Sequence, residues 1–147
     1  MKKITLLILC FLFTQNIDAQ DFKPTLNIRL SCLLFPFTPL ATLEIRTWGN
    51  ITLQGETNLK DTHGFNIKYY TQTRMNGHYF FVGSAFVNSK VLRKDEKSTI
   101  LSYAGYGHAF TFSQKWLLDG RIGIGPTINA DKNSIYPVIK IGIGRKF

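Results

Sequence analysis

The last thirteen residues of the chain, IYPVIKIGIGRKF (Ile135–Phe147), decide its fold class. Isoleucine occupies every second position from Ile139 to Ile143, and lysine or glycine fills the positions between. Successive side chains of a β-strand point to opposite faces, so this period of two gives the segment one apolar and one polar face. A helix would instead need apolar residues three and four positions apart. The segment is therefore predicted to be a β-strand with two chemically different faces.

Six other segments show the same period of two. Gly49-Asn50 is a predicted two-residue hairpin turn, and clusters of glycine, proline or polar residues separate the other segments. A seventh segment, Gly77–Val87, is apolar at almost every position, so the pattern does not assign its faces. No ten-residue window shows a helical stripe. The eight predicted strands are Leu26–Phe35, Leu40–Trp48, Ile51–Glu56, Gly64–Gln72, Gly77–Val87, Ile100–Phe112, Trp116–Thr127 and Ile135–Phe147.

The predicted fold class is all-β, an eight-stranded antiparallel up-and-down transmembrane β-barrel, because a spanning strand needs about 9–11 residues. Alternation alone also fits a soluble lipocalin-like barrel, in which the Leu/Ile faces would turn inward. The lengths of the connections favour the membrane, since short periplasmic turns and longer external loops alternate in outer-membrane barrels. Pro36–Pro39 is a short exception on the long-loop side. The short connections are Gly49-Asn50, Thr73–Asn76 and Ser113–Lys115, and the longer ones are Asn58–His63, Asn88–Thr99 and Ile128–Ser134.

Aromatic and glycine residues fall where a narrow membrane barrel needs them. Trp48, Trp116 and Phe147 all lie at the end of the short connections, where an interfacial aromatic belt is expected. Glycines recur on the polar faces of the last three predicted strands, and a narrow barrel needs small groups beside large ones there.

The segment Lys140–Phe147 also resembles the C-terminal insertion signal of bacterial outer-membrane barrels. Lys140, Gly142 and Phe147 match the polar residue, the glycine two positions later and the terminal aromatic residue of that signal. Arg145 departs from it, because the pattern favours an apolar residue there. The resemblance implies that the barrel-assembly machinery reads this end of the chain. Together with the strand count, it implies a small barrel of the OmpA/OmpX-like class.

The N-terminal residues have the three parts of a secretory signal peptide. Two lysines follow Met1, an apolar run covers Ile4–Phe13, and Ala19 precedes the expected cleavage site. The run is too short for a membrane-spanning helix, which needs about 20 apolar residues. The alternatives are a buried N-terminal helix and a lipoprotein signal at Cys10, whose preceding residue is a large leucine rather than a small one. We expect residues 1–19 to be removed and residues 20–147 to form one barrel domain in the outer membrane of a Gram-negative bacterium.

The polar faces of the predicted strands carry charged residues that would lie inside the barrel if the Leu/Ile faces meet lipid. Buried charges are costly unless they are paired, so these residues are expected to form a linked network. Eight strands leave a lumen that side chains fill. A structural ion-pair core is the predicted role, with a gated or proton-conducting path as the alternative. The lumen residues are Arg29, Glu44, Arg46, Glu56, Lys68, Asp119, Arg121 and Lys140.

The chain has 18 Lys+Arg against 9 Asp+Glu, a net charge of +9. Its basic residues are divided between the predicted lumen and the loops, so a nucleic-acid partner is not expected. The densest charged run, Lys90 to Lys97, is mixed in sign and lies in the longest external loop. It is either a solvated loop tip or a contact for lipopolysaccharide phosphates or an external protein. Outer-membrane lipid is the other expected partner.

No catalytic or metal site is predicted. His63, His78 and His108 lie in different segments and are not expected to converge, and the serines near them in sequence lack the spacing of the lipid A deacylase motif. No cofactor is implied, and Cys32 on a Leu/Ile face is expected to act as a small hydrophobic residue. The expected function is non-enzymatic, with a structural or adhesive role through the external loops. The alternatives are a lipid A-modifying acyl hydrolase and a soluble periplasmic lipocalin-like carrier.

Overall fold

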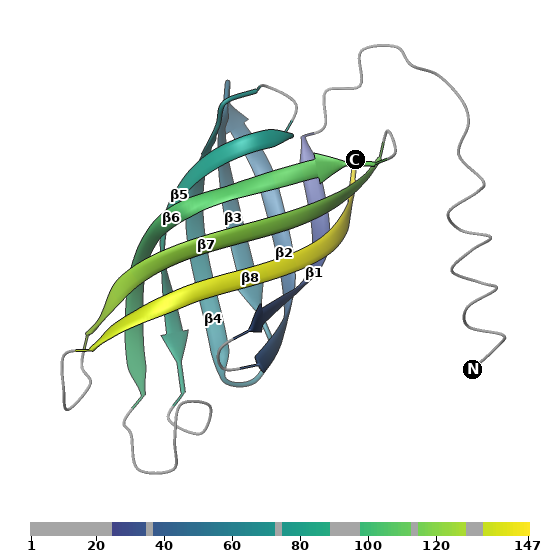
Figure 1. Cartoon of the computed structure of the whole chain (residues 1–147). Helices are drawn as coiled ribbons and strands as arrows, with labels where there is room; N and C mark the ends of the chain where they lie inside the picture. Colours follow the sequence, from purple (N-terminus) through teal and green to yellow (C-terminus); the bar gives the residue numbers. More distant parts are fainter. Residues whose placement is uncertain (1–24, 35–36, 73–74, 89–97, 113–114, 129–133) are drawn as a thin grey trace, which may run out of the picture.

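The protein is a closed barrel of eight antiparallel strands, each paired with its neighbours in sequence, and β8 pairs with β1 to close it (Figure 1). The computed structural model describes residues 25–34, 37–72, 75–88, 98–112, 115–128 and 134–147. Within these residues no helix has the length and apolar character needed to cross a membrane. The predicted all-β antiparallel barrel is confirmed. The strands are β1 (Leu26–Leu34), β2 (Phe37–Trp48), β3 (Ile51–Thr57), β4 (Thr62–Tyr70), β5 (Gly77–Val87), β6 (Thr99–Thr111), β7 (Trp116–Ile128) and β8 (Ile135–Lys146).

The start of β2 differs from the sequence prediction, which placed a turn at Pro36–Pro39. Residues Phe37 to Pro39 already belong to the strand and pair with β1. The amide of Arg46 donates to the Thr25 carbonyl, so the even positions of β2 direct their backbone groups toward β1. Pro39 therefore faces the β3 side, where the ladder has already ended at the pair Ala41–Thr57. A proline is tolerated there because no ladder hydrogen bond is lost.

The strands are strongly staggered around the barrel. Starting from Leu117 and following paired residues once around the barrel returns to β7 at Thr127, ten residues further along. For eight strands this stagger corresponds to a tilt of about 40° from the barrel axis. That value lies within the range of about 35–45° found for membrane-spanning barrels.

The two ends of the barrel carry different connections. The β2–β3, β4–β5 and β6–β7 hairpins lie at the same end as the C-terminus, and β7–β8 turns at the opposite end (Figure 1). The first of these, Gly49-Asn50, is a two-residue turn in which Gly49 has a φ of 53°, a conformation that glycine adopts readily. The Thr25 amide donates to the Phe147 carbonyl at 3.0 Å, so the first described residue and the last lie together. We call this the terminal end.

The barrel is polar inside and apolar outside. Its inward positions hold buried charged, amide and hydroxyl side chains, together with a smaller apolar set that includes Tyr70, Tyr79, Phe81 and Tyr103. The Leu and Ile side chains of the alternating segments point outward, and Ile122 in the middle of β7 is 61% exposed. In Gly77–Val87, the segment whose faces the pattern did not assign, Tyr79 and Phe81 point inward and His78, Phe80 and Val82 outward.

Candidate functional site

Most of the charged residues predicted for the lumen meet in the barrel interior. Arg29 of β1, Glu44 of β2, Lys68 of β4 and Asp119 of β7 form one group, which we call the Glu44 cluster. Arg29 Nη2 lies 2.5 Å from Glu44 Oε2, and Arg29 Nη1 lies 2.8 Å from Asp119 Oδ2. Lys68 Nζ lies 3.2 Å from Glu44 and 3.6 Å from Asp119. Two cations and two carboxylates leave this cluster neutral.

Hydroxyl groups complete the coordination of the two carboxylates. Thr52 Oγ1 and the Tyr70 hydroxyl donate to Glu44 Oε1 at 2.6 and 2.9 Å, and the Tyr79 hydroxyl donates to Asp119 Oδ2 at 2.8 Å. Buried carboxylates remain ionised only where such donors replace water. Tyr70 lies on the same polar face as Asn66 and Lys68, so the alternation predicts that it points inward. The residues around Tyr79 are all apolar or aromatic, so no alternation predicts the direction of Tyr79.

A second group, the Glu56 cluster, consists of Glu56 of β3, Arg121 of β7 and Lys140 of β8. Arg121 Nη2 lies 2.5 Å from Glu56 Oε2, and Lys140 Nζ forms an ion pair with Glu56 Oε1. The Tyr103 hydroxyl donates to the same Oε1 at 3.1 Å. One carboxylate thus serves two cations, so this cluster carries a net charge of +1.

Gln54 joins the two clusters. Arg29 Nη2 donates to its Oε1 at 2.7 Å, and its Nε2 donates to Glu56 Oε2 at 2.9 Å. The side chain is buried on β3 between them. The interior is therefore a single polar network that crosses the barrel and, through Tyr79 and Tyr103, connects all eight strands. Gln54 was not predicted to belong to the network, because only the ionisable residues of the polar faces were expected there.

The network fills the lumen instead of lining a channel. Arg29 and Lys68 are 1% and 0% exposed, and Tyr79 is likewise covered completely. Glycines make the room for these side chains. A Cβ at Gly107 would overlap the ring of Tyr79, and one at Gly144 would overlap Cγ of Arg29. Large side chains therefore lie beside glycines around the interior, as expected of a narrow barrel.

Arg46 lies apart from both clusters, although the sequence places it on the same polar face as Glu44. It is the last inward-facing residue of β2 before the bulge at Arg46–Trp48, and it is only half-buried. Within the described part of the chain it forms no ion pair. Arg46 lies near the terminal end, its Nη2 is buried without a hydrogen-bond partner among the described residues, and the side chain is not part of the interior network.

The aromatic residues predicted for an interface all lie at the terminal end. Trp48 ends β2 and is 83% exposed, Trp116 begins β7, and Phe147 follows β8. The residues of the C-terminal signal divide between the two faces of β8. Lys140 enters the Glu56 cluster, and Gly142 fits against Ser31 Oγ of β1. Phe147 points outward, and its amide donates to the Leu26 carbonyl at 2.8 Å, which fastens β8 to β1.

Two of the three histidines do converge, so the prediction that they would not is wrong for this pair. His78 and His108 are directly opposed on β5 and β6, with their Nδ1 atoms 3.2 Å apart, and the Tyr106 hydroxyl bonds to His78. All three side chains point outward. The different predicted segments of the two histidines are adjacent strands, and the β5–β6 register brings the two side chains together. His63 is elsewhere, with Nδ1 2.8 Å from Thr57 Oγ1.

Two of the serines near these histidines in the sequence, Ser84 and Ser102, pair with each other, and the third, Ser113, lies outside the described residues. Ser84 Oγ lies 3.0 Å from Ser102 Oγ, six residues along the same two strands from the histidine pair. Within the described residues, His, Cys, Asp and Glu side chains form no group of three that could hold a metal ion. Cys32 is half-buried on the outward face of β1, with a free thiol. Residues 1–19 and the charged run Lys90 to Lys97 lie outside the described residues.

Comparison with known proteins adds no relative. No family model matches the chain, and neither a curated protein nor a solved structure matches it significantly.

Proposed function

We propose that this protein is a non-enzymatic integral barrel of a Gram-negative outer membrane, exported by the signal peptide at residues 1–19. Its role would be structural or adhesive, carried by the loops opposite the terminal end. One observation carries the proposal: the barrel is inside out relative to a water-soluble protein, with charges in its interior and large apolar side chains on its surface.

The outward face is suited to lipid. Leu, Ile, Phe and Val side chains from all eight strands are more than a third exposed, and they surround the barrel instead of forming one patch. Soluble monomers rarely expose continuous apolar patches larger than a few hundred Å². In a bilayer the same side chains would lie in hydrocarbon, and the closed strand ladder satisfies the backbone polar groups as a membrane requires.

The interior supports a structural role more strongly than a conducting one. Both clusters are buried, each carboxylate has several donors, and the fully covered Arg29 and Lys68 side chains lie across the lumen. Opening a path would separate charges that have no water to replace their partners, which is costly. The loops opposite the terminal end would then be the parts of the protein available to a lipopolysaccharide or protein partner.

The two alternative functions are less well supported by the geometry. A lipocalin-like carrier needs the Leu/Ile faces to line an internal cavity, and here they point outward. An acyl hydrolase needs a serine within reach of a histidine. In the parts of the barrel that the structure describes, Ser84 bonds to Ser102 and His78 to His108.

Cell fractionation combined with gel mobility tests the proposal. The full-length chain is expressed in a Gram-negative host, and the outer membrane is separated from the soluble periplasm. The protein is expected in the outer membrane, where its unheated form should migrate differently from its boiled form, as folded membrane barrels do. Recovery with the soluble periplasmic proteins would contradict the membrane assignment. Mass spectrometry of lipid A from the same cells tests the hydrolase: an acyl change that requires His108 would contradict a non-enzymatic role.

A further inference from the structure

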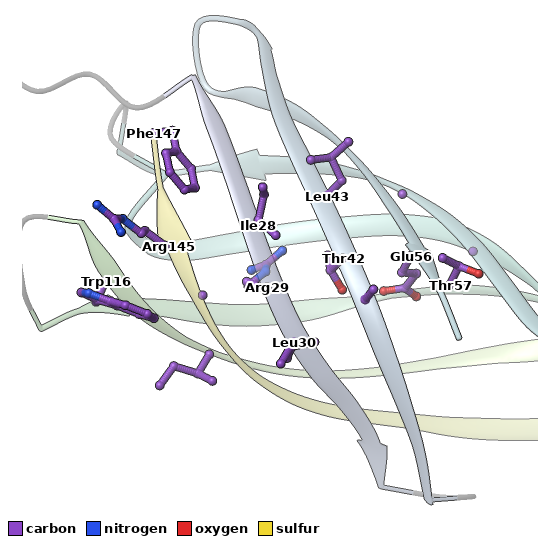
Figure 2. A pocket seen from close by; sticks show the side chains of 15 residues that line it. Ile28, Arg29, Leu30, Thr42, Leu43, Glu56, Thr57, Trp116, Arg145 and Phe147 are labelled. Carbon is purple, nitrogen blue, oxygen red and sulfur yellow. The ribbon is translucent and has the colours of Figure 1, made fainter. Parts of the chain in front are cut away.

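An apolar groove of about 700 Å³ crosses the outer surface of the barrel from β8 over β1 and β2 to β3 (Figure 2). Ile28 and Leu30 of β1, Leu43 of β2 and Ile143 of β8 form its sides. The groove deepens at Gly55 of β3, where an added Cβ would find no atom within 4 Å. Large apolar side chains flank this position, so the groove is a depression in an apolar surface.

One end of the groove is polar and lies at the terminal end of the barrel. Trp116, Arg145 and Phe147 gather there, and the Arg145 guanidinium lies 5.3 Å from the centre of the Phe147 ring (Figure 2). Trp116 Nε1 and Arg145 Nε are buried and donate to no acceptor among the described residues. Arg145 also forms no ion pair with a carboxylate in this part of the chain. A positive charge and unused donors therefore stand at the head of an apolar groove.

The direction of the groove follows from the strand register. Trp116, Arg145, Ile28, Leu43 and Gly55 are successive partners in one outward-facing row across β7, β8, β1, β2 and β3. The row crosses four inter-strand spacings, about 19 Å. Because the strands tilt by about 40°, the row rises about 12 Å along the barrel axis. One leaflet of the hydrocarbon core is about 15 Å thick, so the groove spans most of one leaflet.

We propose that this groove binds one phospholipid of the inner leaflet of the outer membrane, an inference that rests on the proposed function. The lipid phosphate would accept hydrogen bonds from Arg145, with Trp116 beside it. One acyl chain would follow Ile28 and Leu43 to the space above Gly55. This assignment accounts for Arg145, the residue that departs from the C-terminal signal by placing a charge on a lipid-facing position.

The chemistry at the polar end selects the occupant. A guanidinium binds phosphate oxygens through two parallel N–H donors, and tryptophan is favoured at the level of lipid headgroups. The terminal end is the periplasmic end in the proposed topology, so the lipid belongs to the leaflet that faces the periplasm. A second copy of this chain packed on the groove would bury the Arg145 charge with no carboxylate to pair with it. Native mass spectrometry would detect such a dimer.

Native mass spectrometry of the folded mature barrel tests the proposal. Phosphatidylglycerol, or a diacylglycerol with the same acyl chains but no phosphate, is added to the barrel in detergent micelles. The spectrometer then removes the detergent, and the mass of the released barrel shows whether it retains the lipid. The variants are Arg145→Gln, which removes the charge, and Gly55→Leu, which fills the groove. Lys60→Gln in the β3–β4 connection controls for lost charge. Gly120→Leu controls for added bulk, because Gly120 also faces outward and has no atom within 4 Å of an added Cβ.

The wild-type barrel is expected to retain one phosphatidylglycerol. Arg145→Gln should weaken that retention about tenfold, the effect of one charge-assisted hydrogen bond, and should leave retention of the diacylglycerol unchanged. Gly55→Leu should reduce retention of both lipids, and both controls should match the wild type. Each variant is first shown to insert into lipid vesicles by its heat-modifiable gel mobility, so a variant that fails to fold is not read as a loss of binding.

The outcomes separate this inference from the proposed function. Equal phosphatidylglycerol retention by an inserted Arg145→Gln variant and the wild type would overturn the lipid site and leave the membrane barrel intact. A dimer without lipid, whose formation depends on Gly55, would overturn the lipid site as well and identify a second copy as the occupant. Failure of the wild-type chain to insert into vesicles would contradict the membrane barrel and the lipid site with it.

Discussion

Replacing Glu44 by glutamine should destabilise the barrel more than any change of similar size on its surface. The carboxylate accepts hydrogen bonds from Arg29 at 2.5 Å, Thr52 at 2.6 Å, Tyr70 at 2.9 Å and Lys68 at 3.2 Å, and it is fully buried. Glutamine keeps the size of the side chain but removes its charge. The Glu44 cluster then changes from neutral to +1, with no water to solvate the excess cation.

The expected cost is about 3–5 kcal/mol, the usual effect of removing one partner from a buried ion pair. With a denaturant dependence of about 2 kcal/mol per molar urea, the unfolding midpoint falls by about 2 M. Unfolding of the barrel from lipid vesicles is followed in urea by gel mobility and tryptophan fluorescence. Lys60→Gln, on an exposed connection, should stay within about 0.5 kcal/mol of the wild type.

A second substitution distinguishes charge imbalance from loss of packing. Lys68→Met alone leaves the cluster at −1 and should cost about as much as Glu44→Gln. The double variant keeps the Arg29–Asp119 pair and is neutral again, so its loss should fall short of the sum of the single losses by about 2–3 kcal/mol. Additive losses, or a Glu44→Gln variant as stable as the Lys60→Gln control, would refute the view that the interior is held by balanced charge.

The remaining predictions concern packing, assembly and conduction. Gly107→Ala should destabilise the folded barrel by about 1–3 kcal/mol in the same urea assay, because its Cβ meets the Tyr79 ring, whereas Gly120→Ala should have little effect. Deleting Phe147 should lower the amount of folded barrel recovered from outer membranes, and normal recovery would argue against the C-terminal insertion signal. The wild-type barrel should give no single-channel steps in a planar bilayer, since buried side chains cross its lumen; regular steps would show that the network opens.

The alternation of residue types predicted most of the fold. Trp116–Thr127 and Ile135–Phe147 differ from β7 and β8 by one residue each, and Gly77–Val87 coincides with β5. Shifting one alternating segment by a single residue against its neighbour would turn its apolar side chains inward, so the pattern excludes odd shifts of register but leaves even shifts open. The start of β2 was missed because a proline usually ends a strand, and its tolerance at position 39 depends on where the neighbouring β3 ends.

The candidate site was predicted less completely. The sequence shows which residues are charged, but it does not show which of them form ion pairs or hydrogen bonds with one another. Arg29, Glu44 and Asp119 share the polar parity of their strands, which places them inside any barrel with an apolar surface. Their grouping into two clusters depends on the stagger of the strands, which only the closed structure supplies. Gln54 bridges the clusters through that same stagger. Its position between Thr52 and Glu56 on the polar face marks it as inward-facing, but not as the bridge.

The pairing of His78 with His108 had a signal that was not used. The two residues lie near the ends of adjacent predicted strands joined by one hairpin. Counting from the predicted Asn88–Thr99 connection places His78 opposite Ala109, one residue from His108, whereas the structure pairs Val87 with Thr99 and so His78 with His108. The facing of Tyr79 and Phe81 had no such signal, because five consecutive aromatic or apolar positions hide the period of two. Their inward facing depends on the glycines of β6 and β7 that make space for them.

The central claim is that the outward face of the barrel contacts lipid hydrocarbon. Tryptophan fluorescence quenching tests this claim directly. In a background with Trp48 and Trp116 replaced by phenylalanine, one tryptophan is introduced by Ile122→Trp in the middle of β7 or by Lys60→Trp in the β3–β4 connection. The barrel is folded into vesicles whose acyl chains carry bromine. We predict that Ile122→Trp is strongly quenched by the brominated chains and shielded from aqueous acrylamide, and that Lys60→Trp shows the reverse. Acrylamide quenching of both variants, with no effect of the brominated chains on either, would contradict a membrane-spanning barrel.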